Sequence, residues 1–289
     1  MNYDWTDLAF ASKKPLNDLD AIFIAAPREL SAARFKQITK TYLPQGNILL
    51  GVAYEPYVLG LEDQPQFKML ELSSVEPIIT KVNASKPAHT ITTLRYFQRD
   101  LKNILDKLKL HKVLLVNGSW YQSFHFKPEY YTLVNRHIRY EMISPFSDEQ
   151  EARSYAESHA YPAPKLPSEI LSDSEMLALA NEAAKQSFDY STFQTGCALG
   201  RKEGNGYRVL ATSFNRVVPY QTYPMNHGAI RERNFTPSND LNFYDTNHYE
   251  VELMVQALHD KLNLEGTSIF VNVMHCPTCA RMLSCTGIQ

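Results

Sequence analysis

The chain has 289 residues, of which 44% are hydrophobic and 21% charged, and its net charge is −2. This composition is typical of a soluble globular protein of about two domains, and it excludes a disordered chain, a collagen-like repeat and a coiled coil. No apolar run reaches the roughly 18 residues that cross a bilayer, and the N-terminus lacks the pattern of a secretory signal. We therefore expect a cytoplasmic protein without a membrane partner.

Charge and cysteine content narrow the function further. With 29 basic and 31 acidic residues, the chain offers no overall basic surface, so a long nucleic acid is not a favoured partner. Four cysteines are too few for a disulfide framework. Three of them lie in the last 14 residues, and this crowding suggests a local chemical role.

The first half alternates strand-like and helix-like segments, which is typical of a parallel sheet with crossover helices. The clearest helical pattern is Phe97–Leu110, where apolar residues recur at three- and four-residue steps. We predict a Rossmann-like α/β domain over residues 1–148. Its expected strands are Ala21–Ala26, Asn47–Ala53, His89–Leu94, Lys112–Asn117 and Ile138–Ser144.

A polar stretch follows, and we predict a linker over residues 149–170. Its three closely spaced prolines, Pro162, Pro164 and Pro167, favour an extended conformation. A capping box, Ser172 with Glu175, then predicts the start of a helix. We place a second domain at residues 171–289.

The second domain is predicted to contain strands near 194–200 and 207–214, joined by a glycine-containing turn. A polar, aromatic-rich loop over residues 215–247 is long enough to suggest a functional role. A helix is predicted from about His248, followed by a strand over Ser268–Met274 and by Cys276-Pro277-Thr278-Cys279.

Two short motifs at predicted helix starts carry the chemistry. Cys276 and Cys279 are three residues apart and face the same way on a first helical turn, while Pro277 suits the first helical position. Two thiolates with the imidazole of His248 make a three-ligand zinc site, and the open fourth position is typical of catalytic zinc. Glu250, two residues after His248, can transfer protons without being a ligand.

Other interpretations of the cysteine pair remain. Cys-x-x-Cys alone also occurs as a redox pair and as half of a structural zinc site. A structural zinc needs a fourth protein ligand, for which His275 and Cys285 are the candidates.

His-x-Glu followed by a paired-cysteine helix resembles the signature of the zinc nucleobase deaminases. The second half resembles the cytidine deaminase-like superfamily, especially its deoxycytidylate deaminase and tRNA-adenosine deaminase branches. The resemblance implies an α/β/α fold, zinc held by His248, Cys276 and Cys279, and Glu250 as the proton shuttle. It also implies hydrolytic deamination and a homo-oligomer.

The resemblance extends to Asn215, which matches the family's sugar-contacting asparagine. In the long loop, we expect His227 to contact substrate, although a solvated loop is the alternative. The chain departs from the family at His275, where a proline usually precedes the first cysteine. Ten residues follow Cys279, where the family core continues with at least a strand and a helix, so we expect the last elements to be missing.

The first domain has no glycine-rich phosphate loop. Residues 46–53 weakly resemble nucleotidylyltransferase-like folds, but the His-x-Gly-His of that family is absent. Asn117-Gly118-Ser119-Trp120 follows a predicted strand, at the edge where open α/β sheets bind ligands. We expect either a ligand-sensing or scaffolding domain or a structural dimerisation domain.

The sequence is compatible with three functions. The favoured one is a zinc-dependent deaminase of a small cytosine nucleotide or nucleoside, with dCMP as the preferred substrate. The second is a deaminase that edits tRNA or single-stranded DNA, which needs an electropositive approach path. The third is a non-catalytic binding module stabilised by zinc.

Overall fold

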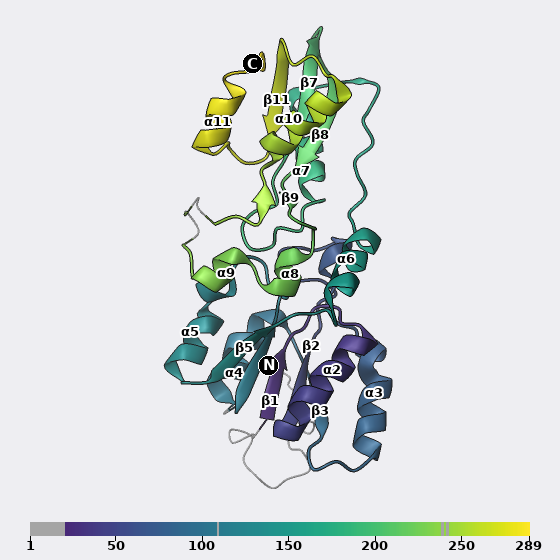
Figure 1. Ribbon diagram of the computed structural model, residues 1–289, viewed down its shortest axis with the longest axis vertical. Helices are drawn as coiled ribbons and strands as arrows, with labels where there is room; N and C mark the ends of the chain where they lie inside the picture. The colour runs from purple at the N-terminus through teal and green to yellow at the C-terminus, as the bar shows by residue number, and fades with distance from the viewer. Residues whose placement is uncertain (1–20, 109, 238–239, 241–242) are drawn as a thin grey trace. The chain divides into compact units, whose positions relative to one another are not determined.

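The computed structural model describes residues 21–289 except 109, 238–239 and 241–242 (Figure 1). The chain divides into two compact units, Met1–Tyr155 with Pro224–Pro237 and Ala156–Tyr223 with Ser238–Gln289. The sequence predicts two domains that are each continuous in the chain, whereas the segment Pro224–Pro237 from the second half of the chain belongs to the first unit.

The first unit contains a parallel sheet in the order β3-β2-β1-β4-β5, which confirms the predicted α/β class and five-stranded sheet. The central strand β1 is buried along its whole length and pairs with β2 on one side and β4 on the other. The strands are β1 (Ala21–Ala25), β2 (Asn47–Ala53), β3 (Ile91–Tyr96), β4 (Lys112–Val116) and β5 (Arg139–Ile143).

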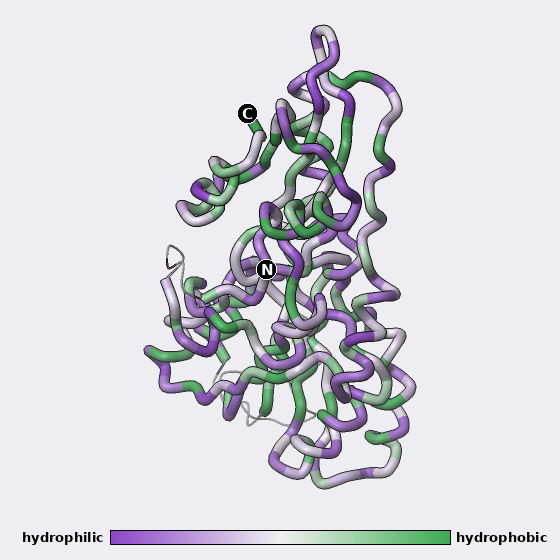
Figure 2. The backbone as a smooth tube through the Cα atoms, turned by 45° about the horizontal axis from the view of Figure 1, so that its top comes forward, coloured by the Kyte–Doolittle hydropathy of each residue, from purple (hydrophilic) through white to green (hydrophobic). Residues whose placement is uncertain are grey.

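Helices connect these strands. Apolar side chains of β1 pack with Phe35 of α2 and Val75 of α3 in one buried cluster, and Figure 2 shows the hydrophobic strands beside helices of mixed hydropathy. The helices are α2 (Ala32–Tyr42), α3 (Leu72–Ala84), α4 (Leu101–Lys107), α5 (Pro128–Asn135) and α6 (Glu149–Ser158), with short 3-10 turns η1 (Leu43–Gln45), η2 (Pro65–Phe67), η3 (Gln98–Asp100) and η4 (Phe124–Phe126).

The predicted linker at residues 149–170 differs from the structure at its start. Glu149–Ser158 forms α6, in which Ala152 and Ala156 lie four residues apart and are both buried. This apolar spacing stabilises a helix. Irregular chain follows over residues 160–167, where the three prolines lie.

The second unit has an antiparallel sheet in the order β11-β7-β8-β6. Helix α7 packs on one face through Met176 and Ala180, and α10 packs on the other through Tyr249 and Leu253, which gives three layers. The elements are β6 (Ile170–Leu171), α7 (Asp173–Ala184), β7 (Gly196–Glu203), β8 (Gly206–Phe214), α10 (Tyr249–Asp260), β11 (Thr267–Val271) and α11 (Pro277–Leu283).

The long loop predicted at residues 215–247 contains short elements. β9 (Arg216–Val217) pairs with β10 (Thr246–Asn247) in the second unit. Between these two strands lie α8 (Tyr223–His227) and α9 (Ile230–Asn234), most of which belongs to the first unit. Within the described residues, no helix is long and apolar enough to span a bilayer.

Gly196 of β7 lies against α7, and a side chain there would collide with the helix. A Cβ atom would lie 2.6 Å from the Ala184 backbone nitrogen and 2.8 Å from the Ala180 carbonyl oxygen. We predict that Gly196→Ala lowers the free energy of unfolding by about 1–3 kcal/mol through overpacking, measured by urea denaturation. Thr212→Val, on the neighbouring strand β8, should change it by less than about 0.5 kcal/mol. Equal stability of the two variants would contradict the close packing of β7 on α7.

Candidate metal centre

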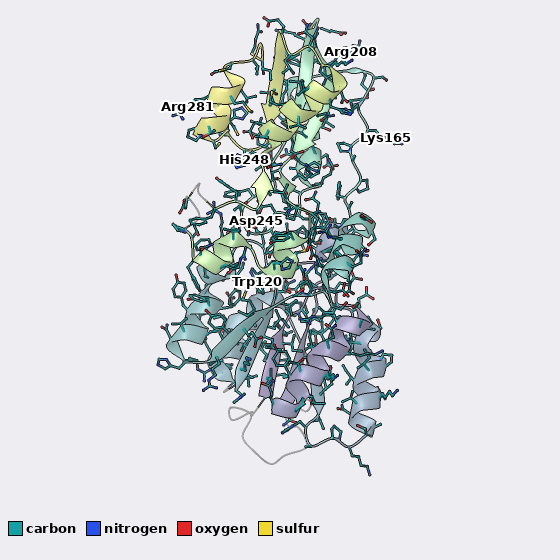
Figure 3. All side chains as sticks on the ribbon, in the orientation of Figure 1. Trp120, Lys165, Arg208, Asp245, His248 and Arg281 are labelled. Atoms are coloured by element: carbon teal, nitrogen blue, oxygen red, sulfur yellow. The ribbon has the colours of Figure 1, made fainter. Side chains whose placement is uncertain are left out.

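His248 lies at the start of α10 as its N-cap residue, with extended backbone (φ −65°, ψ 151°) and no capping hydrogen bond from its side chain. The imidazole is therefore not used to cap the start of the helix. Tyr249 and Leu253 fix the helix by packing against Cys197, Leu199 and Ala211 of the sheet. Figure 3 labels His248 at this end of α10.

Cys276 and Cys279 lie on the first turn of α11. Cys276 is the N-cap residue, and its Sγ accepts a hydrogen bond from the Cys279 backbone N–H at 3.4 Å. Pro277 occupies the first turn, where its missing N–H costs no hydrogen bond. Strand β11 delivers the chain to this helix, because it pairs with β7 up to Val271.

The three predicted ligands come together. The ligand atoms of His248, Cys276 and Cys279 all lie within 4.8 Å of one another, and the Cys279 Sγ is 3.5 Å from the His248 Nδ1. Tetrahedral zinc with Zn–S near 2.3 Å and Zn–N near 2.0 Å separates its ligands by about 3.6 Å. The donor types and their spacing therefore fit zinc.

The group contains three protein ligands rather than four. Neither His275 nor Cys285, the candidates for a fourth ligand, belongs to the group found among the described residues. Cys285 is exposed, and Cys197 is a buried core cysteine whose Sγ lies 3.2 Å from Ser213 Oγ. Three ligands leave one tetrahedral position open, as in catalytic zinc sites.

Glu250 supplies a buried carboxylate one helical residue beyond Tyr249. Its side chain is 1% exposed. The Oε1 atom is 2.8 Å from the Nδ1 of His275, whereas the buried Oε2 atom has no hydrogen-bond partner among the described residues. Burying an oxygen without a hydrogen bond is unfavourable. Oε2 is therefore suited to accept a hydrogen bond from a bound molecule.

His275, whose role the sequence did not reveal, holds Glu250. The Tyr249 hydroxyl donates to the Val273 carbonyl at 2.9 Å, so its oxygen is left to accept. His275 Nδ1 lies 2.9 Å from that oxygen and 2.8 Å from the Glu250 carboxylate. Because both neighbours accept, we assign the proton to Nδ1, which donates to them.

The surroundings of Cys279 oppose a free thiolate. Burial, and then the charge of Glu250, raise the pKa of the Cys279 thiol. The same two causes raise the pKa of the Tyr249 hydroxyl. A thiolate at Cys279 therefore needs a neighbouring positive charge, which a divalent metal ion supplies.

Asn215 follows β8 and holds the loop over residues 189–195. Its Oδ1 accepts from the Thr195 N–H at 2.8 Å, and its Nδ2 donates to the Phe193 carbonyl at 2.9 Å and to Asp189 Oδ2 at 3.3 Å. These bonds engage both ends of the buried amide. The expected contact with a sugar stays a prediction, and the structure gives Asn215 a loop-positioning role.

His227 does not belong to the same unit as His248, Cys276 and Cys279. It ends α8, its imidazole is exposed, and Pro224–Pro237 belongs to the first unit, whereas the metal group belongs to the second. Nearby Arg231 is buried and donates to the Pro237 carbonyl at 2.7 Å. A role of His227 in substrate binding stays a prediction.

Comparison with protein families assigns the second half of the chain. The family described as cytidine and deoxycytidylate deaminase zinc-binding region matches residues 171–289, so the C-terminal half is cytidine deaminase-like. The solved structure of the dCMP deaminase from the cyanophage S-TIM5 in apo form is 17% identical, over 40% of this chain and 76% of that chain, with a TM-score of 0.26. Among curated proteins, no match to this chain was found.

The metal group gives a direct prediction about zinc content. We expect purified protein to hold one zinc ion per chain, and Cys276→Ser to lose it, because a hydroxyl replaces a thiolate ligand. The zinc content per chain would be measured by inductively coupled plasma mass spectrometry after dialysis. Cys285→Ser, which removes an exposed cysteine outside the group, should keep its zinc. Full occupancy in Cys276→Ser would contradict the ligand assignment.

Proposed function

We propose that the second unit is a zinc-dependent hydrolytic deaminase of a small cytosine nucleotide or nucleoside, with dCMP as the favoured substrate. The observation that supports this most is the position of Glu250. A buried carboxylate with one unpartnered oxygen lies on the first turn of α10, two residues after His248 of the three-ligand His/Cys/Cys group. The family match over residues 171–289 supports the deaminase class.

The chain's own residues divide the work of the reaction. Zinc held by His248, Cys276 and Cys279 would lower the pKa of a water molecule and so supply the nucleophile. Glu250 Oε2 accepts one proton of the attacking water and passes it to the ring nitrogen beside the amine-bearing carbon. It then passes the remaining hydroxyl proton to the amine, which leaves as ammonia, so a carbonyl replaces the amine and Glu250 ends the cycle in its starting charge state.

His275 is proposed as a positioning residue. Its Nδ1–H donates a hydrogen bond to Oε1 of Glu250. The other oxygen, Oε2, is then left to exchange protons with the water and the substrate. Burial of the carboxylate excludes water that would otherwise solvate it, and a fixed hydrogen bond offsets part of that desolvation cost.

One assay of ammonia release distinguishes the proposed function from two others. An editing deaminase would act on a tRNA anticodon hairpin or on single-stranded DNA, and a zinc-stabilised binding module would act on neither. Ammonia release would be measured with dCMP, dCTP, cytidine, deoxycytidine, guanine, the hairpin and a cytosine-containing single-stranded DNA. Turnover of dCMP supports the proposal, turnover of only the hairpin or the DNA supports editing, and zinc-loaded protein that turns over none of them contradicts catalysis.

Glu250→Gln tests the proton transfer. The amide keeps the size of the side chain but cannot accept and return a proton, so we predict a loss of about 10²–10⁴-fold in kcat, with zinc retained. Glu252→Gln is the matched control, because Glu252 lies on the same helical turn but its carboxylate contacts Arg216 and Asn247. Equal kcat in Glu250→Gln and the unmodified protein would contradict the assignment.

His275→Ala tests the positioning role. We predict a fall in kcat of about 10–100-fold, the usual cost of removing a group that orients a metal site, with KM nearly unchanged. His275→Asn, whose amide N–H lies near the position of Nδ1, should recover most of the loss. If the two variants lose activity equally, or if only KM changes, hydrogen bonding to Glu250 is not what His275 contributes.

A further inference from the structure

A pocket lies in the first unit, whereas His248, Cys276 and Cys279 belong to the second unit. It has a volume of about 210 Å³ and opens at the carboxyl ends of two neighbouring strands. Ala25, the last residue of β1, lines it together with Leu115 of β4 and Ser119 just beyond that strand. The residues of this pocket all belong to one unit.

The order of the sheet explains why a pocket forms there. From β1 the chain crosses through α2 to β2, whereas from β4 it crosses through α5 to β5, on the opposite side of β1. Right-handed crossovers in opposite directions place these helices on opposite faces of the sheet. The connections after β1 and β4 therefore diverge, and such a switch point is where open α/β sheets bind ligands.

The walls of the pocket suit a flat apolar body. Trp120 and Phe124 line it, with ring centroids 4.7 Å apart, and Leu101 and Leu59 add aliphatic surface. Aromatic rings favour planar partners, which they contact by stacking or edge to face.

Charged groups complete the lining. Within the described part of the chain, neither the Lys127 ammonium nor the Arg99 guanidinium forms a hydrogen bond or ion pair, although Arg99 lies 5.0 Å from the Phe97 ring centre. Glu129 also lines the pocket, and its buried Oε2 lacks a hydrogen-bond partner among these residues. Desolvation lowers the pKa of Lys127, although the charges of Glu129 and Glu232 act in the opposite direction. A bound anion would offset the remaining cost.

A buried carboxylate holds the aromatic wall from behind. Glu232 of α9 accepts from the Trp120 Nε1–H at 3.2 Å and from the Phe124 backbone N–H. Its other oxygen lies 3.4 Å from His125 Nδ1. Trp120 is labelled in Figure 3. The segment Pro224–Pro237 thus fixes the wall in place before any ligand arrives.

We propose that this pocket binds a nucleoside monophosphate, with its base against Trp120 and Phe124. An amine or hydroxyl of the ligand donates to Glu129, and the phosphate lies with Lys127 and Arg99. The volume of about 210 Å³ is below the roughly 300–1,000 Å³ of pockets for drug-sized ligands, which suits a base with its sugar and leaves the phosphate at the mouth. The first unit then serves as a nucleotide-binding domain.

Isothermal titration of the full chain with AMP, GMP, CMP and UMP tests the proposal. The matching free nucleosides and inorganic phosphate are separate arms. We expect at least one monophosphate to bind with a Kd below 1 mM, and its nucleoside and phosphate to bind at least tenfold more weakly. Absence of binding by all four monophosphates, or equal affinity for phosphate alone, would overturn it.

Variants locate the binding. Lys127→Met and Glu129→Gln should each raise the Kd at least tenfold, and Leu101→Trp should block the pocket without removing a charge. Lys81→Met and Glu76→Gln, on the exposed surface of α3, are the matched controls and should leave the Kd unchanged. Unchanged affinity in Lys127→Met and Leu101→Trp, or equal losses in the controls, would overturn the assignment to this pocket.

The metal group offers a further control. Cys276→Ser and Glu250→Gln should bind the monophosphate at the first unit as the unmodified protein does, whether or not the second unit is a deaminase. Loss of that binding site in either variant would place it at the metal group instead. Failure of the proposed deamination and failure of this nucleotide site are thus separate results.

Discussion

The meeting of two helix starts is the constraint on which the candidate metal centre depends. α10 carries His248 and α11 carries Cys276 and Cys279, and neither helix alone offers three ligands. The pairing of β11 with β7 brings the chain back beside α10, which packs on a face of that sheet. The His/Cys/Cys group therefore depends on strand pairing in the sheet as well as on the two sequence motifs.

The same arrangement buries a carboxylate beside the group, and this is costly unless the carboxylate is bonded. One oxygen of Glu250 is held by His275, while the other has no protein partner among the described residues. Tyr249 in turn holds His275 and is anchored to the Val273 carbonyl. The chain thus fixes one oxygen of the carboxylate and leaves the other without a protein partner among the described residues. In the proposed function, this arrangement favours proton transfer without reorganisation.

Local patterns were enough to predict the strands of the first sheet, the capping box at Ser172 and the meeting of His248 with the two cysteines, because each depends on spacing within one or two elements. The contact of His275 with Glu250 depends on how β11 lies beside α10, so spacing could not reveal it, although the missing proline marked the position. The helix at Glu149–Ser158 was missed because its charged residues conceal the buried Ala152 and Ala156. The inclusion of Pro224–Pro237 in the first unit depends on Glu232 finding Trp120 and Phe124, which are more than 100 residues away in sequence.

The proposed deamination depends on a zinc ion with three protein ligands and one open position. X-ray absorption at the zinc edge, on the purified full chain without substrate, tests it most directly. The account predicts two sulfur atoms at about 2.3 Å, one imidazole nitrogen at about 2.0–2.1 Å and one further nitrogen or oxygen atom that is not a histidine. A third sulfur atom or a second imidazole around the metal would contradict it, because the zinc would then be closed by protein and structural.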